Sequence, residues 1–247
     1  MRDIFRIASF GVACAILASP LDAQQHVPLT DERIHELISH ELQDEDLANG
    51  RLEVQVDSRI VTLRGTVPSY WAKQKAIELA LDVPDVEGVE DELDIARAES
   101  DEDLTDEIAK RVLRYAFFTI YDDVNVEVKD GAVTLTGRVT MPYKSKEIAQ
   151  MTSRILGVQD VRNEIRTLSM SLHDRDVRIA VARRIYRDSM FYEYAFRVNP
   201  PIHIIVEGGN VTLTGIVRSE VERRKAEHIA RSTFGVFKVE NKLKLTS

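Results

Sequence analysis

The sequence has very little of what redox and metal chemistry requires. Its 247 residues include a single cysteine, Cys14, which cannot form an internal disulfide or a cysteine-ligated metal centre. The segment from His35 to His40 places its histidines five residues apart, whereas a zinc-protease helix needs them four apart to share one face. A P-loop and a dinucleotide-binding glycine turn are both missing. We therefore predict a protein that is not an enzyme, with no catalytic residue, no metal site and no cofactor.

The sequence also lacks a hydrophobic run long enough to cross a membrane. The apolar run of residues 7–17 is far shorter than the roughly 20 residues that a spanning helix needs. It follows Arg2 and Arg6 and precedes small residues up to Ala23, so residues 1–23 are predicted to be a signal peptide cleaved after Ala23. The alternative is an amphipathic first helix of the folded protein. Cys14 is disfavoured as a lipid-attachment site because the residues before it lack the leucine of a bacterial lipobox.

An overall excess of basic residues is absent as well. The chain carries a formal net charge of −8, which argues against a general nucleic-acid binder. The predicted signal peptide and the lack of a spanning segment favour a periplasmic protein that is peripheral rather than transmembrane.

What the sequence does contain is one short motif, called here the repeated phrase, that occurs three times. Val-Thr-Leu-x-Gly-x-Val begins at Val61, Val133 and Val211, and apolar residues recur at the same offsets from the glycine of each copy. The copies align without a gap over residues 52–93, 124–165 and 202–243. Such agreement identifies an internal repeat, and its periods of 72 and 78 residues suit small domains better than solenoid units.

Each copy has the pattern of a helix, two strands, a second helix and a third strand. Alternating residues such as Val54 and Val56 predict strands with one buried face. Thr30, Thr105 and Asp174 are predicted to cap the first helices. The predicted fold class is α+β, with three tandem small αββαβ domains, each a three-stranded mixed sheet packed against two helices. The domains are predicted at residues 28–97, 102–169 and 173–247, with linkers near 97–103 and 169–175.

Glycines are predicted to define the fold at five positions. The glycine inside each phrase is interpreted as a strand bulge or as a point where the first helix crosses closely over the strand. Two further glycines precede the third strand of the second and third copies. The five are Gly65, Gly137, Gly215, Gly157 and Gly235.

The repeated phrase, the alanine-bearing second helix and the Gly-Val-x-x-Val-x-Asn segments at Gly157 and Gly235 resemble the BON domain. The resemblance covers nearly the whole chain after residue 23. Copy one departs from the pattern, with Pro84-Asp85 before its third strand and Asp91 in place of asparagine. The resemblance implies a module of bacterial envelope and stress proteins, periplasmic or associated with the outer membrane. Such modules contact phospholipid surfaces and support envelope integrity under osmotic stress. No catalytic residues are attached to that family.

The three copies differ strongly in charge. Residues 24–98 hold 7 basic and 17 acidic residues, a net charge of −10, and residues 99–173 hold 10 and 13, a net charge of −3. Residues 174–247 hold 14 basic and 9 acidic residues, a net charge of +5. The three domains are therefore expected to have different functions.

The basic residues of copy three, Arg178 among them, fall mainly on its two predicted helices, and four aromatic residues follow the first of these helices. Basic side chains beside aromatic ones are suited to an anionic lipid surface. The predicted lipid-binding residues are Arg183, Arg184, Arg187, Arg224, Lys225 and Arg231. The alternative is a solvated helix face with internal ion pairs, such as one between Arg223 and Glu227. A second candidate surface comprises Tyr70-Trp71 and residues 141–143, whose alternative role is packing at a helix entry.

The sequence thus predicts a non-enzymatic periplasmic protein whose partner is an anionic phospholipid surface or an envelope protein. In the main alternative, the chain is a protein–protein interaction scaffold in the periplasm or at the outer membrane, and its acidic first copy docks a basic partner. A further alternative is a small-molecule-binding or stress-protective protein acting in the bulk periplasm.

Overall fold

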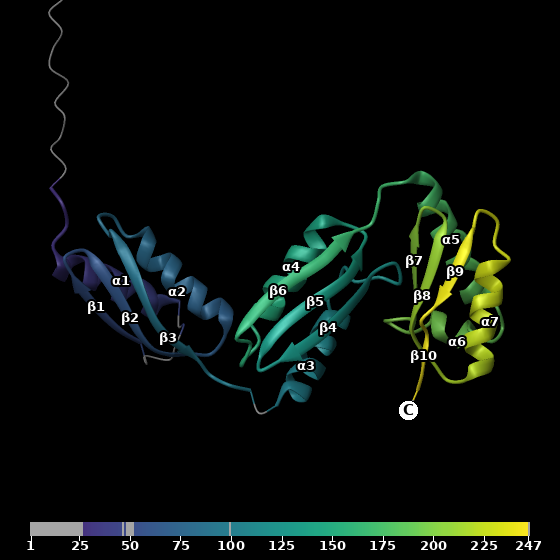
Figure 1. Cartoon of the computed structure of the whole chain (residues 1–247), viewed down its shortest axis with the longest axis horizontal. Helices are drawn as coiled ribbons and strands as arrows, with labels where there is room; N and C mark the ends of the chain where they lie inside the picture. The colour runs from purple at the N-terminus through teal and green to yellow at the C-terminus, as the bar shows by residue number, and fades with distance from the viewer. Residues whose placement is uncertain (1–26, 46, 48–51, 99, 247) are drawn as a thin grey trace, which may run out of the picture.

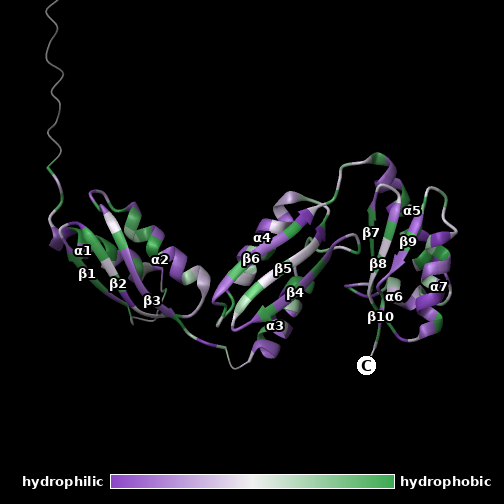
Figure 2. Ribbon diagram, viewed as in Figure 1, coloured by the Kyte–Doolittle hydropathy of each residue, from purple (hydrophilic) through white to green (hydrophobic). Residues whose placement is uncertain are grey.

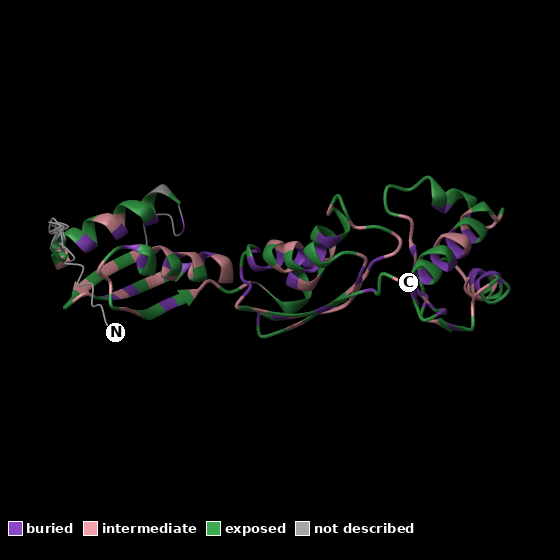
Figure 3. Ribbon diagram, turned by 90° about the horizontal axis from the view of Figure 1, so that it is seen from above, coloured by how far each residue is buried: buried purple, intermediate pink, exposed green. Residues whose placement is uncertain are grey.

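The computed structural model describes residues 27–45, 47, 52–98 and 100–246. The predicted signal peptide, including Cys14, lies outside these residues. Figure 1 shows three α+β domains in a row, and Figure 3 shows the helices of the first two domains on one side of their sheets.

The order of elements is the same in the three domains. Domain 1 comprises α1 (Asp31–Asp44), β1 (Leu52–Asp57), β2 (Ile60–Val67), α2 (Tyr70–Asp82) and β3 (Gly88–Ile95). Domain 2 comprises α3 (Asp101–Leu113), β4 (Asp123–Lys129), β5 (Ala132–Val139), α4 (Pro142–Ser153) and β6 (Asp160–Thr167). Domain 3 comprises α5 (Leu172–Arg187), α6 (Tyr192–Ala195), β7 (Ile202–Glu207), β8 (Asn210–Val217), α7 (Glu220–Arg231), β9 (Lys238–Asn241) and β10 (Lys244–Leu245).

In every sheet the strand that carries the repeated phrase lies in the middle. It pairs antiparallel with the strand before it and parallel with the strand after the second helix. The predicted fold class is confirmed. Domain 3 adds the short helix α6, and its third strand is divided into β9 and β10, both paired with β8.

Each domain has its own hydrophobic core between its helices and its sheet. Figure 2 shows hydrophobic and hydrophilic residues alternating along the strands, which is the pattern of a sheet with one buried face. The buried side chains form three separate clusters, represented by Ile38, Leu63 and Ala76 in domain 1, Ile108, Leu135 and Ile148 in domain 2, and Ile185, Leu213 and Ala226 in domain 3. The predicted alanine-bearing helices therefore do pack closely on their sheets.

An aspartate in the first helix of each domain binds the β-hairpin turn. In domain 2, the Asp101 carboxylate accepts the main-chain N–H groups of Asp130 (2.8 Å) and Gly131 (2.9 Å). Asp31 accepts the equivalent two N–H groups in domain 1, and Asp174 does so in domain 3. Hydrogen bonds to an ionised carboxylate are stronger than neutral ones, so this contact fixes the helix to the hairpin.

Two of the predicted helix N-caps are wrong because of this arrangement. Thr30 caps α1 as predicted, but α3 is capped by Ser100, whose hydroxyl accepts the N–H of Asp103. Thr105 lies inside α3 and donates its hydroxyl to a carbonyl one turn earlier. Asp174 also lies inside its helix, which is capped by Ser171. The Asp174 carboxylate is engaged by the hairpin turn instead.

In domains 2 and 3, the glycine of the repeated phrase is required by the neighbouring strand and not by the first helix. Gly137 has a φ of 126°, and a Cβ atom there would lie 2.1 Å from the carbonyl oxygen of Asp123 at the start of β4. A Cβ atom on Gly215 would lie 1.9 Å from the carbonyl oxygen of Pro201. The prediction that another element comes close to these glycines is therefore correct, but that element is the preceding strand and not the first helix.

Copy one keeps the geometry of the other copies despite its different residues. Asp85 adopts a φ of 66° where the other domains have glycine. Asp91 accepts the N–H of Leu93, as Asn163 accepts that of Ile165. The negative charge of Asp91 is balanced by Lys73, whose ammonium lies 2.8 Å away.

The glycine geometry generates a prediction for stability. Substitution Gly137→Ala is expected to lower the free energy of unfolding of domain 2 by about 3 kcal/mol, because it combines a strained positive φ with a clash against main-chain atoms. Calorimetry of the full chain measures this as a lower transition temperature for domain 2. The control is Gly88→Ala in β3, where nothing lies within 4 Å of the added atom. Equal behaviour of the two variants would contradict the assignment.

Candidate functional site

Domains 1 and 2 meet through the residues that precede and begin α2. Tyr70 donates its main-chain N–H to the carbonyl of Val158 (2.9 Å), and the Arg154 guanidinium lies 4.4 Å from the centre of the Trp71 ring. The Tyr70-Trp71 pair, predicted as a candidate surface or a helix entry, therefore takes part in a domain joint. Of the equivalent residues in domain 2, Tyr143 remains partly exposed and packs edge-on against Phe117.

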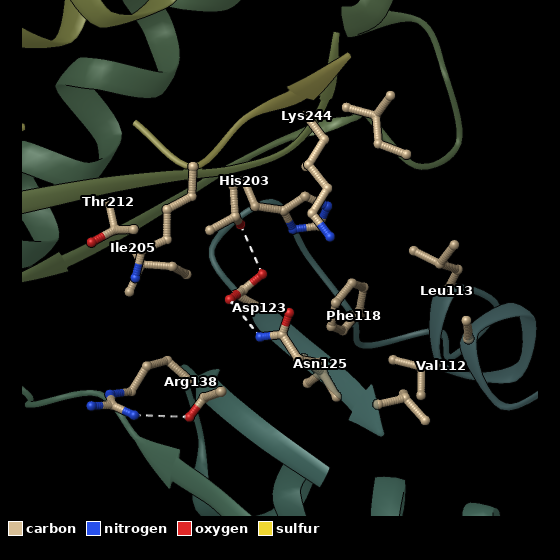
Figure 4. Close-up of a pocket in the computed structure, with 18 of the residues that line it drawn as sticks. Val112, Leu113, Phe118, Asp123, Asn125, Arg138, His203, Ile205, Thr212 and Lys244 are labelled. Carbon is tan, nitrogen blue, oxygen red and sulfur yellow. Dashed lines mark hydrogen bonds between the residues drawn. The ribbon is translucent and has the colours of Figure 1, made fainter. Parts of the chain in front are cut away.

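Domains 2 and 3 enclose a cleft of about 750 Å³. Figure 4 shows Asp123, Asn125 and Arg138 of domain 2 on one side, with His203, Ile205 and Thr212 of domain 3 opposite. The two sides are joined by a hydrogen bond from the Thr214 hydroxyl to Asp123 (2.8 Å) and by an ion pair between Arg138 and Glu207 (3.1 Å). These contacts make the cleft a polar joint between two sheets.

The cleft is bordered by a buried carboxylate, Asp122. Its side chain accepts hydrogen bonds from Thr119, Thr140 and the Lys144 ammonium, the last at 2.7 Å. Its main-chain carbonyl accepts the Nδ1–H of His203 (2.6 Å). Burial by itself would raise the pKa of Asp122, but the hydrogen bonds from Lys144, Thr140 and Thr119 outweigh it and hold the pKa below its usual value.

The predicted lipid-binding residues lie on two adjacent helices, α5 and α7, that cover the sheet of domain 3. Buried Val181 and Ile185 mark the inner side of α5, and Ala226 and Ala230 mark that of α7. The outer sides carry exposed arginines. We call the set of Arg183, Arg187, Arg224 and Arg231 the cationic face.

Two members of the cationic face have no acidic partner within the part of the chain that the structure describes. These are Arg183 and Arg187, both exposed on α5. The two members on α7 are paired one turn along the helix, Arg224 with Glu220 (3.2 Å) and Arg231 with Glu227 (2.6 Å). The alternative of internal ion pairs is therefore correct for α7, although Arg223 pairs with Glu220 and not with Glu227.

Three other basic residues of the predicted cluster have structural contacts. Arg184 donates to the carbonyl oxygen of Ser232 (2.5 Å) and joins α5 to the end of α7. Lys225 pairs with Asp188 (3.2 Å) between the same two helices. Arg178 is only 7% exposed and faces domain 2, with its guanidinium 6.0 Å from the Tyr121 ring. Burial lowers the pKa of Arg178, and this residue cannot contact a bilayer.

The aromatic residues after α5 divide into two groups. Phe191 and Tyr194 are buried in the core of domain 3. Tyr192 and Phe196 are exposed and pack edge-on against each other, with 4.9 Å between their ring centres. Sequence reasoning missed two further exposed rings, those of Phe234 and Phe237 after α7. An alignment of the three copies could have indicated them, because the other two copies have no aromatic residue at the equivalent positions.

The described residues contain neither a cluster of metal ligands nor a membrane-spanning helix. No group of three or more His, Cys, Asp or Glu side chains there is placed to hold a metal ion. None of the described helices is long and apolar enough to cross a membrane. His35 and His40 both lie on α1 with their side chains exposed.

Comparison with known proteins gives a family match along most of the chain. A family model described as BON domain matches residues 30–97, 100–169 and 195–247. Osmotically-inducible protein Y of Escherichia coli (strain K12) is 28% identical over 154 residues, covering 56% of this chain and 73% of that protein.

Two solved structures from type III secretion systems were also found. The C-terminal domain of CdsD of Chlamydia trachomatis is 14% identical with a TM-score of 0.26, covering 89% of this chain and 100% of that one. The periplasmic domain of the inner membrane protein PrgH from S. typhimurium is 12% identical with a TM-score of 0.21, covering 84% of this chain and 100% of that one.

The buried Asp122–Lys144 pair generates a prediction for stability and its pH dependence. Substitution Asp122→Asn is expected to destabilise domain 2 by about 3–5 kcal/mol at neutral pH, because it leaves the Lys144 charge buried without a counter-charge. A lowered carboxyl pKa stabilises the fold above the unfolded value of about 3.9, and this contribution is lost as the pH falls through the folded value. The Asp122→Asn variant has no carboxylate to make this contribution. Its free energy of unfolding is therefore expected to decrease less than that of the wild type as the pH falls through that range.

Calorimetry of the full chain between neutral and acid pH measures both effects. The matched control is Asp160→Asn, which removes an exposed carboxylate at the start of β6. If the Asp122→Asn chain retained the wild-type transition of domain 2 at neutral pH, the assigned role of the pair would be wrong.

Proposed function

The chain belongs to the BON domain family, and on that premise we propose that it is a periplasmic envelope protein that binds anionic phospholipid surfaces through domain 3. It supports the cell envelope under osmotic stress without catalysing a reaction. The predicted signal peptide at residues 1–23 and the similarity to an osmotically inducible protein support this assignment.

The observation that carries the proposal is the pair of unpartnered arginines on the cationic face. Arg183 and Arg187 expose their guanidinium groups on the outer side of α5, and neither shares its charge with a described acidic side chain. Each basic residue near an anionic bilayer contributes about 1 kcal/mol of attraction. An arginine already paired with glutamate contributes less, so Arg183 and Arg187 supply most of the attraction at this face.

The charge of the other domains favours one orientation on the membrane. Residues 24–98 carry a net charge of −10 and residues 174–247 carry +5. An anionic surface therefore attracts domain 3 and repels domain 1, and both effects weaken as salt shortens the range of the electrostatic field. The chain is expected to contact the bilayer at one end.

Charge reversal on α5 tests this function. The double substitution Arg183→Glu and Arg187→Glu is expected to weaken binding to vesicles of phosphatidylglycerol and phosphatidylcholine roughly thirtyfold or more, since it removes about 2 kcal/mol of attraction and adds repulsion. Vesicle flotation of the full chain at low salt measures the bound fraction. Wild-type chain is expected to bind much less to pure phosphatidylcholine.

A control with the same change in net charge is Arg162→Glu with Arg166→Glu, two exposed arginines on β6 of domain 2. This variant is expected to bind as the wild type does. Equal binding of the wild type to neutral and anionic vesicles, or binding to neither, would refute the lipid function. Recovery of one stoichiometric envelope protein by the wild type without any lipid dependence would favour the scaffold alternative.

A further inference from the structure

The loop between α7 and β9, residues 232–237, exposes two aromatic rings. Phe234 is 98% exposed and Phe237 is 77% exposed. Solvent exposure of two phenylalanines in six residues is costly, because a phenyl ring is among the largest apolar side chains. The rings therefore indicate a surface that is covered by another apolar material when the protein functions.

The equivalent loop of domain 2, residues 154–159, has a different role, because it contacts domain 1. Gly157 donates its N–H to the Pro68 carbonyl (3.0 Å), and the Gln159 side-chain amide donates to the carbonyl oxygens of Ile95 and Ala96. Phe237 occupies in domain 3 the position of Gln159 in domain 2. A phenyl ring cannot donate those hydrogen bonds, so the domain 3 loop is not built for the joint that its counterpart makes.

The Phe237 ring is held in place by the rest of domain 3. It stacks on His173 with 6.0 Å between ring centres, and a Cβ atom on Gly209 would lie 2.5 Å from it. Its main-chain N–H donates to the carbonyl of Gly209 (2.9 Å). The loop thus presents the ring from a fixed support, which lowers the entropy cost of inserting it into a second phase.

The loop follows directly after Arg231 of the cationic face, and Arg184 of α5 donates to the carbonyl oxygen of Ser232 at its start. The outward stripe of α7 runs from Val221 through Arg224 and Arg231, and Phe234 follows at the end of the helix. Val221 and Phe234 are both exposed, the first near the start of α7 and the second three residues beyond its last residue. Arginines between two apolar ends are suited to a helix that lies flat in the plane of a charged bilayer surface.

We propose that Phe234 and Phe237 insert into the interfacial region of an anionic phospholipid bilayer and orient α7 parallel to its plane. This inference rests on the proposed function and adds the element that penetrates the membrane. The arginines attract the headgroups, and the phenyl rings retain the protein once it has arrived. The net charge of +5 on residues 174–247 favours an anionic lipid surface as the material that covers the rings.

A tryptophan reporter tests the insertion directly. Trp71 is the chain's one tryptophan, so Trp71→Phe removes the background and Phe234→Trp then places a single fluorophore on the loop. On vesicles of phosphatidylglycerol and phosphatidylcholine, its emission is expected to shift to the blue and to be quenched by phospholipids brominated on their acyl chains. The double variant Phe234→Ser and Phe237→Gln is expected to bind these vesicles about tenfold more weakly.

The matched control is Leu156→Ser, the exposed residue at the Phe234 position in domain 2. It is expected to bind as the wild type does. Wild-type flotation without quenching of the reporter, or unchanged binding of the double variant, would overturn the insertion while leaving the proposed function intact. Absence of wild-type flotation would overturn both. Self-association of the wild type that is abolished in the double variant, without lipid, would assign the loop to a protein interface and also overturn the inference.

Discussion

The architecture of this protein depends on a charge-assisted contact between one aspartate and one hairpin turn, made once in every domain. The turn adopts positive φ angles at both central residues and points two main-chain N–H groups in the same direction. A carboxylate in the first turn of the preceding helix accepts both. Because the helix is fixed at this end, its apolar side rests on the sheet and its outer side is left to the solvent. In domain 3 that outer side carries Arg183 and Arg187.

The joints between domains show how small modules become one extended molecule. Tyr70 and Ala98 of domain 1 pack against the core of domain 2, and Ile120 and Tyr121 of domain 2 pack against the core of domain 3. Each joint adds main-chain hydrogen bonds, such as that from Ile204 to Ile120 (2.7 Å). The second joint involves β7, and it also buries Arg178 of α5 beside Tyr121. The four arginines of the cationic face on α5 and α7 remain exposed in this arrangement.

Triplication followed by divergence explains why the three domains are not interchangeable. The core positions are similar in all copies because each core must fill the same space between helices and sheet. The surfaces are under no such constraint, and their net charges range from −10 to +5. The loop after the second helix illustrates the same point, with Glu87, Gln159 and Phe237 at one position. The first forms an ion pair with Arg59, the second bonds a neighbouring domain, and the third is exposed.

The sequence by itself determined the repeat, the order of elements and the core, because the periods of helices and strands are local and fixed offsets from Gly65, Gly137 and Gly215 expose them. It also determined the distribution of charge among the domains, which is a matter of counting. Only the tertiary structure decided which arginines are free, since Arg178 and Arg184 look like Arg183 in the sequence but contact residues far away in the chain. It likewise decided that Asp174 binds a turn rather than caps its helix. Contacts of this kind depend on how distant segments are brought together, and no local pattern records them.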